Sequence, residues 1–228
     1  VEEKSRSLAK SSSIKSKLHP LLQALLEFIC DLESMKDAMV EFEIDVKKMP
    51  LGKLSKRQIQ DAYSVLAHLS KRLSKIDQLD QGFILGESNR FYTLIPHDFG
   101  MKVPPLLDNP EIIKNKLKML EDLREIELAY NILKQDLEAD VNPLDQHYRQ
   151  LRTQLQPMDT NSEEFSRIKQ YVKLTHGSTH SSYTLEVVAV FDVERAEEKA
   201  RYDEFSAGRH NRQLLWHGSR RTNWVGIL

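Results

Sequence analysis

The segment from Pro110 to Leu137 constrains the fold most, because no glycine or proline follows its first residue. Apolar residues recur in it near the helical period, Asn109 is placed to cap the first turn, and proline takes the first helical position. About 28 residues at ~1.5 Å each would make a rod of ~42 Å. Such a helix is long enough to run through a bundle, so we expect it to organise the helices around it.

Earlier segments show the same helical period. The first helix is predicted to begin at Pro20, and a second such run covers Leu32 to Val46. Ser55 is placed to cap a long third helix with one apolar face, and a shorter helix is expected over 87–95. Together with the long segment, these helices predict an all-α domain over residues 18–138.

The pattern changes in the last third of the chain. Two helices are expected, over 144–151 and from residue 161 or 162 to about 174, before apolar side chains take alternate positions over 183–194. A strand that is apolar on both faces is typical of a buried sheet, but only one more strand, 212–216, is evident. Two strands cannot close a core. Residues 139–228 are therefore predicted to be the incomplete start of a mixed α/β domain, which makes the chain α+β.

Composition excludes several classes of protein. A formal net charge of −1, with charged residues at 29%, argues against a chain that mainly wraps nucleic acid or coats an anionic membrane. The longest apolar stretch, Val187–Phe191, is far shorter than the roughly 20 residues of a membrane helix, and the N-terminus lacks the apolar core of a signal peptide. We expect a soluble chain that is not secreted and has no membrane partner.

The first 17 residues contain six serines and five lysines or arginines. They contain too few apolar groups to offset the entropy of ordering. Residues 1–17 are interpreted as a linker from something upstream. The single cysteine, Cys30, lies in an amphipathic pattern and cannot form an internal disulfide, so it is interpreted as a core residue. A reducing compartment, cytosol or nucleus, is expected.

The run 214–216, Leu-Leu-Trp, leads directly into His217, Gly218 and Ser219. A histidine and a serine offer hydrogen bonds on either side of a glycine, whose main chain a ligand can approach without a Cβ in the way. This arrangement indicates a ligand site at a strand end. A strand end with a capping serine and a partly buried histidine explains the same residues equally well.

Two other clusters have both a functional and a structural explanation. His176 and His180 have the spacing of two zinc ligands, but Gly177 lies between them and a third ligand is missing, so caps of a loop are the favoured interpretation. Glu121 and Glu125, with Asp122 and Glu127 beside them, are either paired carboxylates of a site or a polar helix face.

A third cluster is basic and surrounds Pro50; it consists of Lys47, Lys48, Lys53, Lys56 and Arg57. The cluster could bind phosphates or an acidic partner domain. Alternatively, it is the solvated start of a helix. The sequence contains neither a nucleophile with a nearby base, nor a P-loop, nor a G-x-G-x-x-G motif. Residue spacing therefore defines no reaction class.

Four long motifs, in order along the chain, resemble the poly(ADP-ribose) polymerases that are activated by DNA damage. They are Lys-Met-Pro-Leu-Gly-Lys-Leu-Ser-Lys-Arg-Gln-Ile at 48–59, Phe-Tyr-Thr-Leu-Ile-Pro-His-Asp-Phe-Gly at 91–100, Pro-Leu-Asp-Gln-His-Tyr at 143–148 and Leu-Leu-Trp-His-Gly-Ser-Arg at 214–220. The match covers roughly residues 15–228. The first half is most similar to the regulatory domain of the family's founding member, and the second half is more similar to the second member.

The resemblance implies a helical, autoinhibitory domain at 18–138 packed on the start of an ADP-ribosyltransferase domain that uses NAD as a substrate and no metal. By this similarity His217 would hydrogen-bond the adenosine ribose, Gly218 would bind the nicotinamide carboxamide through its backbone, and Ser219 would contact the nucleotide. Glu121 and Glu125 match acidic positions that face the NAD pocket, where carboxylates would help to exclude the pyrophosphate.

The family transfers ADP-ribose from NAD to protein side chains or a growing polymer, with release of nicotinamide. Its catalytic glutamate, nicotinamide-stacking tyrosines and donor loop follow the His-Gly-Ser strand, so they are expected beyond Leu228. The resemblance thus implies that the parent protein is a nuclear enzyme of the DNA-damage response that contacts DNA through upstream modules. The 228-residue fragment is expected to be inactive alone. The alternative is a non-catalytic helical interaction module that uses the basic cluster as its binding surface.

Overall fold

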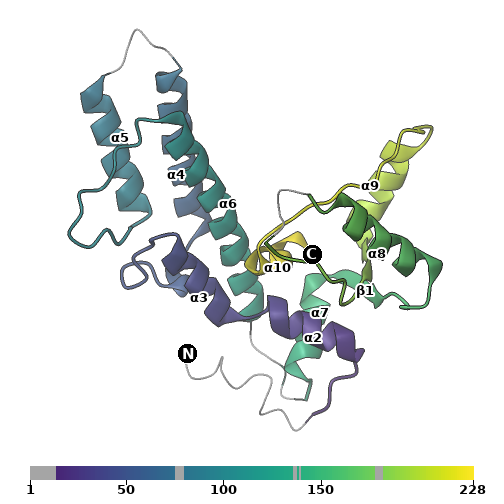
Figure 1. The fold of residues 1–228 in the computed structure, drawn as a ribbon. Helices are drawn as coiled ribbons and strands as arrows, with labels where there is room; N and C mark the ends of the chain where they lie inside the picture. Colours follow the sequence, from purple (N-terminus) through teal and green to yellow (C-terminus); the bar gives the residue numbers. More distant parts are fainter. Residues whose placement is uncertain (1–13, 75–79, 136–137, 139, 178–181) are drawn as a thin grey trace. The chain divides into compact units, whose positions relative to one another are not determined.

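The computed structural model describes residues 14–74, 80–135, 138, 140–177 and 182–228 (Figure 1). The chain divides into two compact units, which are described separately. The helical unit comprises residues 28–136 and 217–227, and the mixed unit comprises 1–27, 137–216 and 228. The segment 217–227 therefore belongs with the helices rather than with the apolar run 214–216 that precedes it.

The helical unit is built around α4 (Lys56–Leu73), which contacts both α5 (Gln81–Leu94) and α6 (Pro110–Leu133) (Figure 1). The remaining elements of this unit are α3 (Leu32–Glu41), the 3-10 turns η1 (Leu51–Lys53) and η4 (Arg221–Asn223), and the short α10 (Trp224–Ile227). Helix α2 (Pro20–Ile29) begins in the mixed unit and ends in the helical unit. The prediction of an all-α arrangement for the first half of the chain is confirmed.

Side-chain caps fix where the helices begin. Ser55 Oγ accepts a hydrogen bond from the Gln58 backbone N–H at 3.3 Å, and Asn109 Oδ1 accepts from the Glu111 N–H at 2.7 Å, both as predicted. The Gln58 side chain donates a hydrogen bond to the Leu94 backbone carbonyl at 2.6 Å. The start of α4 is therefore tied to the end of α5.

The core of the helical unit lies along one face of α6. Leu120, Leu123 and Ile126 are completely buried, as are Leu66 and Leu69 of α4. Burial of apolar surface contributes roughly 25 cal/mol per Å², so this face supplies much of the stability of the unit. None of the described helices combines the length and the apolar character needed to cross a membrane.

Three helix boundaries differ from prediction. Helix α6 ends at Leu133 rather than Leu137, with Lys134 as its C-cap. Helix α3 ends at Glu41 rather than Val46, because Glu43 adopts a left-handed backbone conformation (φ 60°) that stops it. Helix α5 begins at Gln81 rather than Glu87. Its glycines lower helix propensity, but the Asp80 side chain accepts hydrogen bonds from the Gly82 and Phe83 backbone N–H groups, and Ile84 in the first turn is buried.

The mixed unit contains one small antiparallel sheet. Its elements are α7 (Pro143–Leu151), β1 (Thr153–Pro157), α8 (Glu163–Thr175), β2 (Phe191–Arg195) and α9 (Ala196–Ser206). Leu155 of β1 lies opposite Val193 of β2. Arg152, with φ 54°, ends α7 in the left-handed region and turns the chain into β1.

The predicted strands were largely wrong. Of the expected strand 183–194, only 191–194 lies in a paired strand, β2, and residues 212–216 belong to no strand in the described part of the chain. Leu185 and Val188, predicted to be buried, are 57% and 81% exposed. Sequence reasoning also missed β1 and α9. An apolar alternating run becomes a strand only where a partner strand satisfies its backbone, and periodicity does not identify that partner.

The end of the predicted linker is attached to the start of α7. The Asn142 side chain donates to the Ile14 carbonyl at 2.7 Å, and the Lys17 backbone N–H donates to Asp145 Oδ2 at 3.0 Å. Ser16 Oγ also donates to the Asp145 carboxylate. The rest of the linker, residues 1–13, lies outside the described residues.

His97 is buried and held in its neutral form. A lysine ammonium group only donates, so His97 Nε2 accepts from Lys116 Nζ at 2.8 Å, and Nδ1–H donates to the Ile95 carbonyl at 2.6 Å. Three aromatic rings surround the imidazole, those of Phe91, Tyr92 and Phe99. Burial, and then the positive charge of Lys116, lower the pKa of His97 from 6.5 to about 4.

This depressed pKa predicts a pH-dependent loss of stability. Between pH 6.5 and about 4 the unfolded chain binds a proton at His97 that the folded chain does not, so stability falls as the pH is lowered through this window. The loss attributable to His97 should approach 3 kcal/mol, about 1.4 kcal/mol per pKa unit. Urea unfolding at a series of pH values measures it. His97→Gln, which keeps a neutral donor and acceptor, should lose this part of the dependence; identical slopes would contradict the assignment.

Candidate functional site

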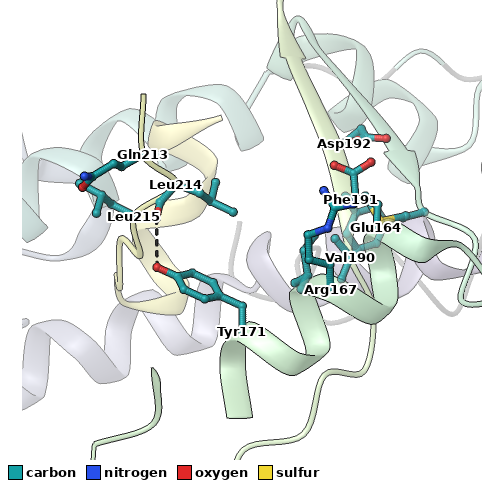
Figure 2. Close-up of a pocket in the computed structure, with 11 residues that line it drawn as sticks. Glu164, Arg167, Tyr171, Val190, Phe191, Asp192, Gln213, Leu214 and Leu215 are labelled. Atoms are coloured by element: carbon teal, nitrogen blue, oxygen red, sulfur yellow. Dashed lines mark hydrogen bonds between the residues drawn. The ribbon is translucent and has the colours of Figure 1, made fainter. Parts of the chain in front are cut away.

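The apolar run that leads to the candidate site is fastened to α8 of the mixed unit. Trp216 stacks on Tyr171 with ring centroids 5.0 Å apart, and its Nε1–H donates to Thr175 Oγ1 at 2.8 Å. The Tyr171 hydroxyl donates to the Leu214 carbonyl at 3.0 Å (Figure 2). These contacts fix the backbone just before His217 without a β-ladder.

A hollow of about 640 Å³ lies between α8, β2 and residues 213–215 (Figure 2). Its apolar side chains are Met158, Ile168, Tyr171, Val190, Phe191, Leu214 and Leu215, and its polar ones are Glu164, Arg167, Asp192 and Gln213. Leu214 and Leu215 are 71% and 75% exposed. The hollow is thus an open apolar surface beside the run, and none of the predicted site residues lines it.

The three predicted ligand-binding residues lie just past this run, in the helical unit. His217 and Gly218 are exposed, and a Cβ added to Gly218 would meet nothing within 4 Å, so its main chain is open to a ligand. Ser219 is half-buried, and its Oγ accepts a hydrogen bond from Asn223 Nδ2 at 3.2 Å.

Arg220 binds the helices on either side of it. Its guanidinium group donates to both carboxylate oxygens of Glu41, at 2.6 and 2.9 Å, and its Nε lies 3.5 Å from Asp122 Oδ2. The same group lies over the ring of Phe42, 4.9 Å from its centroid. The hydrogen bonds to Glu41 raise the pKa of Arg220 and lower the pKa of Glu41. Two-point binding of this kind fixes orientation as well as distance.

The next residues extend the attachment. Arg221 Nη2 donates to Asp31 Oδ2 at 3.2 Å, and Asn223 Nδ2 donates to Asp122 Oδ1 at 2.7 Å. Thr222, Asn223 and Val225 are all buried. Ser219 and the residues after it therefore form a docked segment, 219–227. Its polar side chains bind Asp122 of α6, Glu41 at the end of α3 and Asp31 at the N-cap of α3.

Asp122 is the site residue that sequence reasoning missed. Spacing alone makes it a neighbour of Glu121 and Glu125, yet it is 7% exposed and pairs with both Asn223 and Arg220. A signal was available: Asp122 lies three residues after Met119 and four before Ile126, on the apolar face of the helix. A carboxylate on a buried helix face requires partners, and here the docked segment supplies them.

The two glutamates predicted to face a pocket are placed differently from each other. Glu121 is exposed, whereas Glu125 is half-buried and lies so close over Gly226 that a Cβ there would overlap its carboxylate. Burial, and then the charge of Glu121, raise the pKa of Tyr63 on α4 to about 12, and Glu125 adds to this rise. Both carboxylates thus act electrostatically on Tyr63, and their orientation toward NAD stays a prediction.

The other candidate clusters are not drawn into this site. His176 Nε2–H donates to the Tyr183 carbonyl at 3.2 Å, while His180 lies outside the described residues. Within the described part of the chain, no group of three or more His, Cys, Asp or Glu residues could hold a metal ion. All five side chains of the basic cluster are exposed, and two pair with aspartates: Lys48 with Asp45 and Arg57 with Asp61.

Comparison with known families accounts for both units. The model of the poly(ADP-ribose) polymerase regulatory domain matches residues 16–148, more than half of the chain, and that of the catalytic domain matches residues 162–228. The chain belongs to the poly(ADP-ribose) polymerase family. The docked segment and the His-Gly-Ser motif fall within the part that matches the catalytic domain.

Several curated members of the poly(ADP-ribose) polymerase family align with the chain. Poly [ADP-ribose] polymerase 1 of Gallus gallus is 55% identical over the whole chain, which covers 22% of that protein. Poly [ADP-ribose] polymerase of Drosophila melanogaster is 49% identical over 96% of the chain and 22% of its own length. Poly [ADP-ribose] polymerase 2 of Homo sapiens is 43% identical over 96% of the chain and 38% of its own length. The chain thus spans between about a fifth and two fifths of these relatives.

The contacts of Arg220 generate a prediction about the docked segment. Arg220→Ala removes the two-point bond to Glu41 and the pairing with Asp122, so backbone amides of 219–227 should exchange with deuterium faster than in the unaltered chain. The difference should shrink at high salt, because screening weakens the same ion pairs. The control is Arg57→Ala, an exposed arginine 4.0 Å from its partner, which should leave this segment unchanged. Equal exchange in all three proteins would contradict the attachment.

Proposed function

We propose that the chain is part of a nuclear, NAD-dependent protein poly-ADP-ribosyltransferase of the DNA-damage response. The observation that carries the proposal is the open His-Gly-Ser backbone next to a segment docked on the helical unit, within the catalytic-domain match. In this proposal NAD is the substrate, protein side chains are the acceptors and nicotinamide is released. DNA would be contacted by modules upstream of residue 1, and a nuclear, reducing location suits the unpaired Cys30.

The proposed roles of the three residues follow from their chemistry. His217 is exposed and can hydrogen-bond an adenosine ribose, and the Gly218 backbone offers the paired donor and acceptor that a carboxamide requires. Ser219 would contact the nucleotide. Cleavage of the bond between nicotinamide and ribose develops positive charge on the sugar, which a fixed carboxylate stabilises. The family resemblance assigns that carboxylate to a glutamate after Leu228.

A comparison of two lengths of the protein tests this function. A form extended through a complete catalytic domain should incorporate label from NAD into protein, and the 228-residue chain should not. In the extended form Gly218→Val should abolish labelling by blocking the approach to the main chain. In the 228-residue chain the same substitution should leave stability unchanged, because a Cβ at position 218 meets nothing within 4 Å. Labelling by the 228-residue chain would disprove its inactivity, and an unlabelled extended protein would disprove the function.

A second candidate function is a non-catalytic interaction module. It is favoured by the exposure of all five side chains of the basic cluster around the start of α4. Cations at a helix N-terminus gain nothing from the helix dipole, so an acidic partner domain would stabilise them. This candidate predicts that the extended form neither binds nor consumes NAD, whereas the proposed transferase must do both.

We also propose that the helical unit restrains the transferase. Leu120 and Leu123 are fully buried on α6, and Asp122 between them binds the docked segment. A loosened α6 would therefore release the residues that follow Ser219. In the family resemblance, Glu121 and Glu125 of the same helix would also help to keep the pyrophosphate of NAD out.

Restraint by α6 predicts a linked change in stability and activity. Leu123→Ala should lower the free energy of unfolding by ~2–5 kcal/mol, because it leaves a cavity in the core, and should raise the DNA-independent activity of the extended form. Leu128→Ala, on the same helix but 40% exposed, is the matched control and should change both less. Urea unfolding and label incorporation measure the two effects. Lower stability with unchanged basal activity would count against restraint.

A further inference from the structure

Asn223 lies between the buried Asp122 and the half-buried Ser219. Its Nδ2 is 2.7 Å from Asp122 Oδ1 and 3.2 Å from Ser219 Oγ, and the residue itself is 6% exposed. Asn223 is part of the turn η4, four residues after Ser219. Neither the residue pattern nor the family resemblance assigns it a role.

The hydrogen-bond partners fix which way the Asn223 amide faces. A carboxylate accepts hydrogen bonds and does not donate them, so the group facing Asp122 must be the NH₂. One N–H of the amide donates to Asp122 Oδ1 at 2.7 Å, and the other donates to Ser219 Oγ at 3.2 Å. The amide oxygen accepts from Thr222 Oγ1 at 3.3 Å. If the Asn223 amide were reversed, its oxygen would face the buried Asp122 carboxylate. Two acceptors without a proton between them are unfavourable in a buried position.

Asp122 is itself held in place. Its other oxygen lies 3.5 Å from Arg220 Nε, and Arg220 is in turn bound to Glu41 through both outer nitrogens. Because Asp122 belongs to the buried face of α6, the direction of the Asn223 amide is set by the helical core.

We infer that Asn223, oriented by Asp122, is a positioning residue that makes the Ser219 hydroxyl a hydrogen-bond donor toward an acceptor oxygen of the bound nucleotide. A serine hydroxyl has one proton, and with its oxygen already accepting from Asn223 that proton is free to point away, toward the ligand. A phosphate oxygen is a pure acceptor and suits such a donor. The inference deepens the proposed function and rests on it for the identity of the ligand.

A double variant that exchanges the side chains of Asp122 and Asn223 distinguishes a positioning role of Asn223 from a purely structural one. In the double variant Asp122→Asn/Asn223→Asp, an amide and a carboxylate still face each other, so the attachment to α6 is kept with donor and acceptor reversed. The carboxylate at 223 cannot donate to Ser219, whose proton must then turn toward it and away from the ligand. In the extended transferase, KM for NAD should rise roughly three- to tenfold, the size of one hydrogen bond, with kcat little changed.

Matched variants complete the experiment. Asp122→Asn alone keeps an acceptor oxygen for Asn223, so it should raise KM less than the double variant does. In a Ser219→Ala background the exchange should have no further effect on KM, because the group that it reorients is gone. An unaltered KM in the double variant, or a full additional rise in the Ser219→Ala background, would overturn the inference.

The 228-residue chain provides an independent readout that needs no NAD. In nuclear magnetic resonance spectra the two Asn223 side-chain amide protons should exchange slowly with water, and Ser219→Ala should shift only one of them strongly. Rapid exchange of both, or indifference to Ser219→Ala, would overturn the inference even in an active enzyme. If these spectra agree while the extended form consumes no NAD, the positioning of Ser219 stands and the proposed function fails.

Discussion

The place of the docked segment in the helical unit depends on a buried carboxylate, that of Asp122, in an apolar helix face. Desolvating Asp122 on α6 is unfavourable unless charged and polar partners surround it, and the partners come from residues about a hundred positions later in the chain. Residues 219–227 match the catalytic domain in sequence, but because of this requirement they pack in the helical unit. The main chain next to the candidate ligand site is thereby placed by the chemistry of a helix core.

The helices were predictable because the forces that define them are local. Ser55 and Asn109 satisfy backbone N–H groups two or three residues away, and the apolar face of α6 repeats within each pair of turns. The strands were not predictable in this way, because a strand needs a partner strand whose position depends on the whole fold. Residues 183–190 have the composition of a buried strand and belong to no strand, whereas the polar β1 is paired with β2.

The candidate site was predictable only in part, for a related reason. The types of residues at 217–219 indicate a ligand site, and the family resemblance supplies its nature. Of the groups that hold this segment, Glu41 and Asp31 look like an ordinary helix-surface residue and an ordinary helix cap when the sequence is examined locally. Asp122 stands out on the apolar face of its helix, but its position does not identify its partners. Their pairing with Arg220, Arg221 and Asn223 spans about 100 to 190 positions, and nothing in either segment alone encodes the match.

The attachment of Arg221 has a consequence for the order of folding. Asp31 caps α3 by accepting from the Glu33 backbone N–H, and the same side chain accepts from the Ser34 hydroxyl and from Arg221, 190 positions along the chain. Closing a loop of that length carries a large entropic cost, so the local bonds of Asp31 form well before the distant one. Helix α3 therefore starts to form on its own local bonds, while the bonds around its cap are completed only when Arg221 packs against it.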